Sequence, residues 1–265
     1  EEQPPDESWE SLAGSQSANS SWKGRDKEPP GGDKRPRGHK APVGEEPPFA
    51  LDVFSGENAP VAYALAWCGW RVEPIDLLLD AQHDLSKAEF QLQVASLVDT
   101  CDAAIWAVDC STLSRAREVA IRGHNGGPKP LRAENAVRGL RSLTGRDATR
   151  VEQANSFIDF TFAQIAKLVT GGSATILESP ARSHLWGFQQ LKDIRQMPGW
   201  QRTLYDACCW GGARRKQQAL ESNVPEIQAL QASCHHVHSK SEWTPYRGKD
   251  GAMVYPSSGE AEYTE

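Results

Sequence analysis

The sequence has few cysteines and none of the spacings that disulfide-rich or redox proteins use. Its 265 residues contain six cysteines and no Cys-x-x-Cys pair, so we expect no disulfide framework. It also lacks a secretory signal pattern, an internal repeat and an apolar run long enough to span a bilayer. These absences argue against a secreted module, a membrane protein and a solenoid. We expect an intracellular protein, nuclear or cytoplasmic.

Apolar residues are scarce in the first part of the chain. The overall hydrophobic fraction is 38%, and residues 1–48 hold eight of the 17 prolines together with many Ser, Gly, Glu and Lys residues. Such a segment buries too little apolar surface to offset its chain entropy. We predict a disordered low-complexity tail over 1–48 and one folded domain over 49–265. The last part of that domain, 200–265, is expected to be irregular and to contain cysteine and histidine.

Short apolar runs alternate with helical patterns in the rest of the chain. The predicted strands cover residues 49–56, 70–76, 101–110, 173–180 and 203–212. A helix follows the first strand, with Asn58 as its cap, Pro60 in its first turn and Gly69 at its end. The clearest helix covers 151–172, where apolar residues recur every three or four positions. This alternation predicts a doubly wound, mostly parallel α/β sheet of Rossmann type with helices on both faces.

Polar and chemically reactive residues follow four of these strands. The first strand ends in Phe54-Ser55-Gly56, the second in Asp76, the third in Cys110 and the fourth in Glu178. Ligands of open α/β sheets bind outside the carboxyl ends of the strands. A glycine turn lets a cofactor approach the backbone, and an acid after the second strand can hold ribose hydroxyls. The order predicts a nucleoside-cofactor site followed by a thiol and a carboxylate.

Five stretches in this order resemble one enzyme family. "DVFSG", "GWRVEPID", "DCSTLSRAR", "LESPARSHLW" and "CCWGGARRK" look like S-adenosylmethionine-dependent DNA cytosine-C5 methyltransferases, and in particular their compact phage-type and protist mobile-element relatives. The resemblance covers about 49–260. It implies S-adenosylmethionine as cofactor and DNA as partner.

The resemblance also implies a role for individual residues. Cys110 would be the nucleophile that adds to cytosine C6, which makes C5 reactive toward a methyl sulfonium. Glu178 would support that charge shift at N3, and Arg214 or Arg215 would brace the base. The cofactor site implied by the resemblance contains Phe54, Ser55, Gly56, Asp76 and, near adenine, Asp84.

Several features depart from the family pattern. The turn after Gly56 lacks the family's further glycines, Glu57 puts a negative charge near the expected cofactor carboxylate, and no long insert can serve as a target-recognition domain. Asp109 stands where the family has proline before the cysteine, and Ser179 stands where asparagine follows the glutamate. An acid beside a thiol raises the pKa of the thiol and lowers its thiolate population. We therefore expect a weakened nucleophile.

The region after Cys110 is strongly basic. Residues 111–150 contain nine Lys or Arg residues and three acids, which suits an anionic partner such as nucleic acid. The alternative is an exposed region that is simply rich in arginine. The expected contacts to nucleic acid are Ser114, Arg115, Arg117, Arg122, Lys129 and Arg132.

A cysteine and histidine cluster lies near the C-terminus. Cys208, Cys234, His236 and His238 would form a two-sulfur, two-nitrogen set that suits zinc, although the spacing matches no standard zinc finger. In an extended segment, residues 234, 236 and 238 face the same way. The alternative is a buried cysteine beside a surface histidine loop.

Two other functions stay open at this point. The chain can be a catalytically inactive nucleic-acid-binding module of a mobile element, which needs only a basic face. It can also be an unrelated thiol enzyme in which Cys110 works with His124 or His184. That enzyme needs a histidine within hydrogen-bond distance of Cys110. A cytosine methyltransferase instead needs Cys110 and Glu178 within reach of one planar base, beside an open cofactor cleft.

Overall fold

The structure is a computed structural model that describes residues 46–118, 129–212, 214–239, 243, 246–247 and 253–254. The chain divides into two units, Glu1–Pro47 and Pro48–Glu265, and the second is described here. The predicted disordered tail falls almost wholly outside the described residues.

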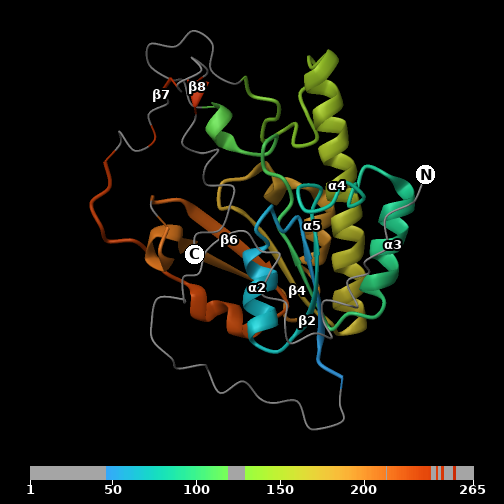
Figure 1. The fold of residues 1–265 in the computed structure, drawn as a ribbon. Coiled ribbons are helices and arrows are strands. Elements are labelled where there is room, and N and C mark those ends of the chain that lie inside the picture. Colours follow the sequence, from blue (N-terminus) through green and yellow to red (C-terminus); the bar gives the residue numbers. More distant parts are fainter. Residues whose placement is uncertain are drawn as a thin grey trace, which may run out of the picture. The chain divides into compact units, whose positions relative to one another are not determined.

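The second unit is built on a six-stranded sheet with the strand order β2-β1-β3-β4-β6-β5 (Figure 1). Across the sheet the strands are β2 (Arg71–Ile75), β1 (Phe49–Val53), β3 (Ala103–Trp106), β4 (Ala174–Pro180), β6 (Gln217–Ser222) and β5 (Gln201–Asp206). β2, β1, β3 and β4 pair in parallel, whereas β6 is antiparallel to both of its neighbours. The α/β class and the mostly parallel sheet are confirmed, but the sheet is mixed. Two regular strands also lie within the part of the chain that was expected to be irregular.

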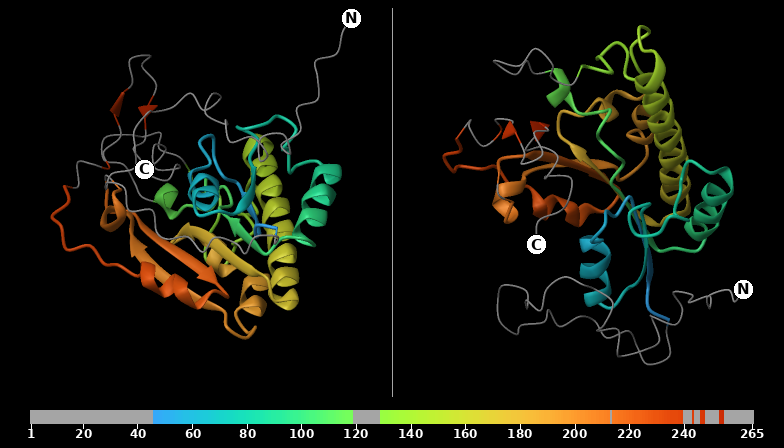
Figure 2. Two further views of the ribbon diagram at one scale, coloured as in Figure 1. Left: turned by 60° about the horizontal axis from the view of Figure 1, so that its bottom comes forward. Right: turned by 45° about the horizontal axis from the view of Figure 1, so that its top comes forward.

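Helices cover both faces of this sheet (Figure 2). One face carries α3 (Ala88–Val98), α4 (Gly145–Gly171) and α5 (Gln189–Ile194), and the other carries α2 (Pro60–Trp67). Strand alternation explains the two layers: Ala104 and Trp106 join the core cluster with Ile158 and Phe162 of α4, whereas Ile105 lines the opposite face. In the described part of the chain, no helix combines the length and the apolar character that a bilayer span requires.

Shorter elements complete the described chain. They are the 3-10 turns η1 (Arg115–Glu118), η2 (His184–Gly187), η3 (Ala207–Trp210) and η4 (Pro225–Leu230), and the pair β7 (Tyr246–Arg247) and β8 (Met253–Val254). The strand predicted over 203–212 therefore ends at Asp206 and continues as η3.

The ends of α2 and α4 differ in part from the sequence prediction. Ala59, not Asn58, is the N-cap of α2, and it makes no side-chain cap hydrogen bond. Oδ2 of Asp52 in β1 instead accepts the N–H of Ala62 in the first turn, at 3.0 Å. α4 begins at Gly145, six residues before the predicted start at 151, because the polar segment 145–150 joins the apolar helix as an exposed first turn. Gly172 ends α4 with a φ of 81°, as expected for a glycine at this position.

Candidate active site at the strand ends

The order of the strands marks where a ligand is expected to bind. The chain runs from β1 out to β2 and then returns past β1 to β3, so the order reverses at β1. Ligands of open α/β sheets bind outside the carboxyl ends of the strands at such a reversal. Residues 54–56 follow β1 and Cys110 follows β3, while Glu178 lies at the carboxyl end of β4 directly beside β3.

The turn after β1 is held in an unusual conformation. Phe54 and Gly56 have positive φ angles of 64° and 74°, which is costly for phenylalanine and frequent at binding sites. The backbone N–H of Phe54 donates to the carbonyl of Ile75 at 2.8 Å. The N–H of Gly56 donates to Oδ2 of Asp76 at 2.9 Å, and Oδ1 of Asp76 accepts the N–H of Leu78 at 2.8 Å. Asp76 therefore fixes the turn and still has acceptor capacity for a ligand.

The same turn offers room and one unsatisfied hydroxyl group. A Cβ atom added to Gly56 would meet nothing within 4 Å. The side chain of Ser55 is buried, and its Oγ has no hydrogen-bond partner in the described part of the chain. Asp84 lies in the loop after β2, where its Oδ1 accepts the N–H of Ser86 at 2.9 Å. Phe54, Ser55, Gly56 and Asp76 are therefore brought together at one polar turn, whereas the contacts that Asp84 makes in the described chain lie within its own loop.

The loop that carries Cys110 is fixed by its own side chains. Oδ1 of Asp109 accepts the N–H of Ser111 at 2.8 Å, and Oδ2 accepts the hydroxyl of Ser111 at 2.7 Å. Asp109 thus forms a local turn with Ser111. The backbone N–H of His184 in η2 donates to the carbonyl of Leu113 at 3.0 Å and holds the far end of the loop.

Arg132 forms hydrogen bonds to the Cys110 loop, and the role predicted for it from the sequence is wrong. It was expected to bind nucleic acid, but its side chain is only 1% exposed. Its guanidinium donates to the carbonyl and hydroxyl oxygens of Thr112 at 3.2 and 3.0 Å, to the carbonyl of Val137, and to Oδ1 of Asn155. Arg132 is therefore a structural residue that positions the Cys110 loop and is not available to phosphates.

Cys110 belongs to a group of interacting ionisable side chains. Burial raises the pKa of its thiol to about 11, and Asp109 and Glu178 raise it as well, whereas Lys216 lowers it. Burial and Glu178 also raise the pKa of Tyr205. The effect of Asp109 has the expected direction, but burial is the larger cause. Glu178 therefore acts electrostatically on both Cys110 and Tyr205, and Lys216 acts on Cys110. These residues lie near the ends of β3, β4, β5 and β6.

Three of these four side chains line a pocket of about 330 Å³ on the sheet face that carries α2. Its floor contains Ile105 and Ile176, and its polar lining consists of Glu178, Tyr205, Lys216 and Gln218. Gln218 is 7% exposed, and its Oε1 has no hydrogen-bond partner in the described residues. An apolar cleft with a few convergent polar groups is the usual form of a small-ligand site.

A second pocket, of about 430 Å³, lies elsewhere. Residues of α3 and α4 line it, together with Arg138. Arg138 and Asp159, which form an ion pair at 2.7 Å, are part of its wall. Because it lies away from the reactive strand ends, we assign no chemistry to it.

The arginines predicted to brace the base lie outside the lining of the site pocket. Nε of Arg215 is 3.3 Å from Oδ2 of Asp206, and the guanidinium of Arg214 is 6.0 Å from the ring of Trp243. Lys216 lines the pocket instead. It stands in the stretch "CCWGGARRK", but nothing in the sequence alone distinguished it from the two arginines. Tyr205 and Gln218 were also missed. Alternation along the strand predicted over 203–212 could have indicated Tyr205, whereas Gln218 lies in a strand that was not predicted.

Two of the predicted nucleic-acid contacts are already engaged within the protein. Arg115 pairs with Glu118 at 3.0 Å and with Glu134 at 2.8 Å. Ser114 accepts the N–H of Ala116 through its Oγ at 3.2 Å. Arg122 lies outside the described residues. Arg115 and Ser114 are therefore engaged within the protein, which makes them less available to phosphates.

A smaller basic group remains beside the Cys110 loop. Nε of Arg117 donates to the carbonyl of Lys129 at 2.9 Å, and Nη2 of Arg150 in α4 is 3.4 Å from Oγ of Ser111. Burial lowers the pKa of Arg117, and the charge of Arg150 lowers it further. Asp147 partly compensates both charges, because its Oδ1 lies 3.9 Å from Nη1 of Arg150 and its charge raises the pKa of Arg117.

The histidine that the thiol-enzyme alternative requires is engaged elsewhere. His184 is buried, and its Nε2 lies 2.7 Å from Oε1 of Glu118. His124 lies outside the described residues. In the part of the chain that the structure describes, Glu178 and Lys216 are the charged residues of the pocket lining that shift the pKa of Cys110.

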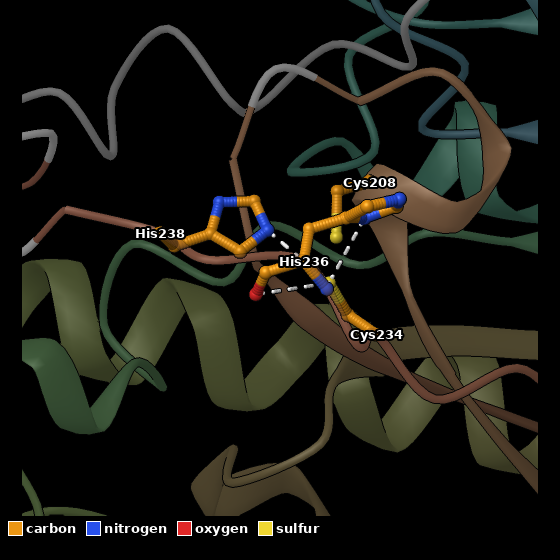
Figure 3. A group of neighbouring side chains, drawn as sticks. All are labelled: Cys208, Cys234, His236 and His238. Carbon is orange, nitrogen blue, oxygen red and sulfur yellow. Dashed lines mark hydrogen bonds between the residues drawn. The ribbon is translucent and has the colours of Figure 1, made fainter.

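The predicted metal ligands are brought together. Cys208, Cys234, His236 and His238 each offer one ligand atom, and these atoms lie within 4.8 Å of one another (Figure 3). The cluster can therefore hold a metal ion.

One buried carboxylate was not singled out from the sequence. Asp52 lies in β1, 1% exposed, and burial raises its pKa from 3.8 to about 6, with a smaller contribution from Asp76. Between pH 3.8 and about pH 6, the carboxyl group of Asp52 therefore keeps a proton in the folded state that it has lost in the unfolded state. Stability consequently falls as the pH rises through this window.

We therefore expect Asp52→Asn to stabilise the protein at neutral pH. An amide oxygen can still accept the N–H of Ala62, and the cost of ionising a buried carboxyl disappears. The expected gain in the free energy of unfolding is about 3 kcal/mol at pH 8 and close to zero below pH 4. Urea unfolding across this range measures it. An equal effect of the substitution at every pH would contradict the account.

Comparison with known proteins adds no relative. No family model matches the sequence, and a search of curated proteins finds no significant match.

Proposed function

We propose that this chain is an S-adenosylmethionine-dependent methyltransferase with a Rossmann-like, doubly wound sheet, acting on C5 of cytosine in DNA. The observation that carries the proposal is the grouping of Cys110, Glu178 and Lys216 at the ends of adjacent strands. A thiol beside a carboxylate and a cation, at the edge of an apolar pocket, suits addition to an electron-poor heterocycle.

Cys110, Glu178 and Lys216 each have a different role in this reaction. Sγ of Cys110, as thiolate, bonds to C6 of the base, and the electron pair of the C5–C6 double bond makes C5 nucleophilic. Glu178 faces N3 and stabilises the change there by hydrogen bonding or proton donation. Lys216 lowers the pKa of Cys110 and balances the charge of Glu178. After C5 gains the methyl group, loss of the C5 proton and cleavage of the Sγ–C6 bond restore the aromatic ring.

The turn after β1 supports the cofactor part of the proposal. S-adenosylmethionine, when bound, supplies a methyl group on a positively charged sulfur. The open space beside Gly56, the unsatisfied hydroxyl of Ser55 and the carboxylate of Asp76 suit its polar groups. The second ligand that we propose is zinc, for the cysteine and histidine cluster treated below.

The DNA part of the proposal depends on the basic group beside Cys110. A base inside a duplex cannot reach a thiol in a pocket, so it must rotate out of the stack. Arg117, Lys129 and Arg150 lie where they can hold the phosphates on either side of such a base.

Binding of S-adenosylmethionine tests the cofactor site, and Asp76→Asn is the informative variant. We expect this change to weaken binding at least about tenfold, because a neutral amide loses the charge-assisted hydrogen bonds of a carboxylate. Asp80→Asn is the matched control, since Asp80 lies in the same loop and accepts the N–H of Gln82. Isothermal titration calorimetry measures both. Absence of binding by the wild type at millimolar ligand would overturn the cofactor assignment.

A second candidate is an inactive nucleic-acid-binding module. The raised pKa of Cys110, about 11, favours it because the thiol is protonated at neutral pH. This candidate predicts DNA binding that weakens steeply with salt, together with no binding of S-adenosylmethionine.

A further inference from the structure

The cysteine and histidine cluster joins two segments that are distant in sequence. Cys208 belongs to η3, and the other three ligands come from one extended segment that follows η4 (Figure 3). Sγ of Cys234 lies 3.2 Å from Nδ1 of His236 and 3.2 Å from Nε2 of His238. The three ligands of this segment therefore point to one spot, where Cys208 also ends.

The geometry and the ligand types suit zinc. Tetrahedral zinc with bonds of about 2.3 Å to sulfur and about 2.0 Å to nitrogen places its ligand atoms about 3.3 to 3.8 Å apart. The present atoms lie within 4.8 Å of one another, so shifts under about 1 Å would complete the tetrahedron. Two thiolates and two imidazoles are a zinc set, and four protein ligands leave no open position for catalysis.

The surroundings hold the ligands in place before a metal binds. Asp206, the last residue of β5, accepts the backbone N–H of Cys234 at 2.8 Å through Oδ2, and the same oxygen lies 3.3 Å from Nε of Arg215. The N–H of Asp206 donates to the carbonyl of Ala232 at 2.9 Å. The segment that carries three ligands is thus already attached to the end of β5. Such supporting contacts are typical of metal sites.

The cluster also adjoins the wall of the pocket. Ala207 and Trp210 of η3 line the pocket on either side of Cys208. The N–H of Ala207 donates to the carbonyl of Lys216 at 2.8 Å, and Nε1 of Trp210 donates to the carbonyl of Leu230 at 3.2 Å. A metal bound to Cys208 would therefore fix η3, and through it the backbone of Lys216.

We propose that Cys208, Cys234, His236 and His238 form a closed structural zinc site that clamps η3 to the following segment and fixes the pocket wall. The ion takes no part in bond making. It binds as Zn²⁺ to two deprotonated thiols and two neutral imidazoles, with release of the thiol protons to solvent. The inference goes beyond the proposed methylation, because a structural zinc site is compatible with any activity of the pocket.

The metal content of the full chain tests this inference, and the sequence supplies matched controls. We expect about one zinc ion per wild-type chain by inductively coupled plasma mass spectrometry, and less than one fifth of that in Cys234→Ser and in His236→Ala. Cys209→Ser and His235→Ala change immediate neighbours outside the cluster and should keep the ion. Wild type without zinc after refolding with Zn²⁺, or controls that lose it equally, would overturn the proposal.

A second measurement applies if the cysteine variants fail to fold. Co²⁺ added to the metal-free wild-type chain should give the absorption bands of tetrahedral thiolate ligation, and Zn²⁺ should displace them. Hydrogen exchange should then be slower in residues 207–216 with zinc than without it. Spectra of octahedral Co²⁺, or a disulfide between Cys208 and Cys234 in the freshly purified chain, would contradict the site. Because neither readout needs cofactor or DNA, failure here is distinguishable from failure of the proposed function.

Discussion

Cys110→Ala is expected to lower methyl transfer to cytosine by more than about 1,000-fold, because removal of a covalent nucleophile removes the reaction path itself. Alanine fills the same position without the sulfur, and the loop keeps its own supports at Ser111, Thr112 and Leu113. The fold should therefore survive. Transfer of a tritiated methyl group from S-adenosylmethionine to DNA, per mole of folded chain, measures the effect.

Cys101 provides the matched control for this experiment. It is buried at the opposite end of β3, and burial raises its pKa to about 11, as for Cys110. Cys101→Ala should leave the activity per folded chain unchanged, with at most a small loss of stability from the cavity. Equal losses in the two variants would show that a general packing defect, and not the nucleophile, explains the result.

Arg132→Met is expected to lower the free energy of unfolding by about 3 kcal/mol or more. Methionine nearly fills the space, but it leaves a buried oxygen atom of Thr112 and partly buried oxygen atoms of Val137 and Asn155 without their donor. The gain from removing a buried charge offsets part of this cost, since burial lowers the pKa of Arg132 to about 10. Urea denaturation at pH 7 measures the change.

The control for Arg132 is a nearby arginine with an exposed ion pair. Arg138 pairs with Asp159 at 2.7 Å, and its side chain is 51% exposed. Arg138→Met should therefore cost less than about 1 kcal/mol. If Arg132→Met proved as mild as this control, the buried hydrogen bonds of Arg132 would not be what holds the Cys110 loop.

The parallel half of the sheet and its strand ends could be predicted from the sequence. Strands buried on both faces are continuous apolar runs, and the polar residues that end them mark one edge of the sheet. β5 was predicted in part, by the strand expected over 203–212. β6 was not predicted, because the stretch that forms it, "QQALES", contains only two apolar residues. Its place between β4 and β5 is set by tertiary contacts.

Burial decides which charged residues can act, and the sequence does not report burial. Arg132 and Arg117 stand in the same basic region, yet one is enclosed and the other is not. Asp52 lies within the apolar run that forms β1, and its ionisable side chain is buried there. Lys216, the residue before β6, lines the pocket, whereas the neighbouring Arg214 and Arg215 do not.

The metal cluster was predicted with all four of its ligands, and the structure brings these four residues together. Residues 234, 236 and 238 alternate along an extended segment and share one side. The sequence alone does not favour Cys208 over Cys209 as the fourth ligand. The conformation of η3 decides it, since the turn presents Cys208 to the cluster.

The central claim is that Cys110 adds covalently to a cytosine held by Glu178, and trapping tests it most directly. Duplex DNA that contains 5-fluorocytosine blocks the last step, because fluorine cannot leave C5 as a proton does. With S-adenosylmethionine, the wild type should form a denaturation-resistant complex, faster at pH 9 than at pH 7, because the thiol titrates near pH 11. Cys101→Ala should form it too, and Cys110→Ala should not. No complex at either pH, from a chain that binds both cofactor and DNA, would contradict the account.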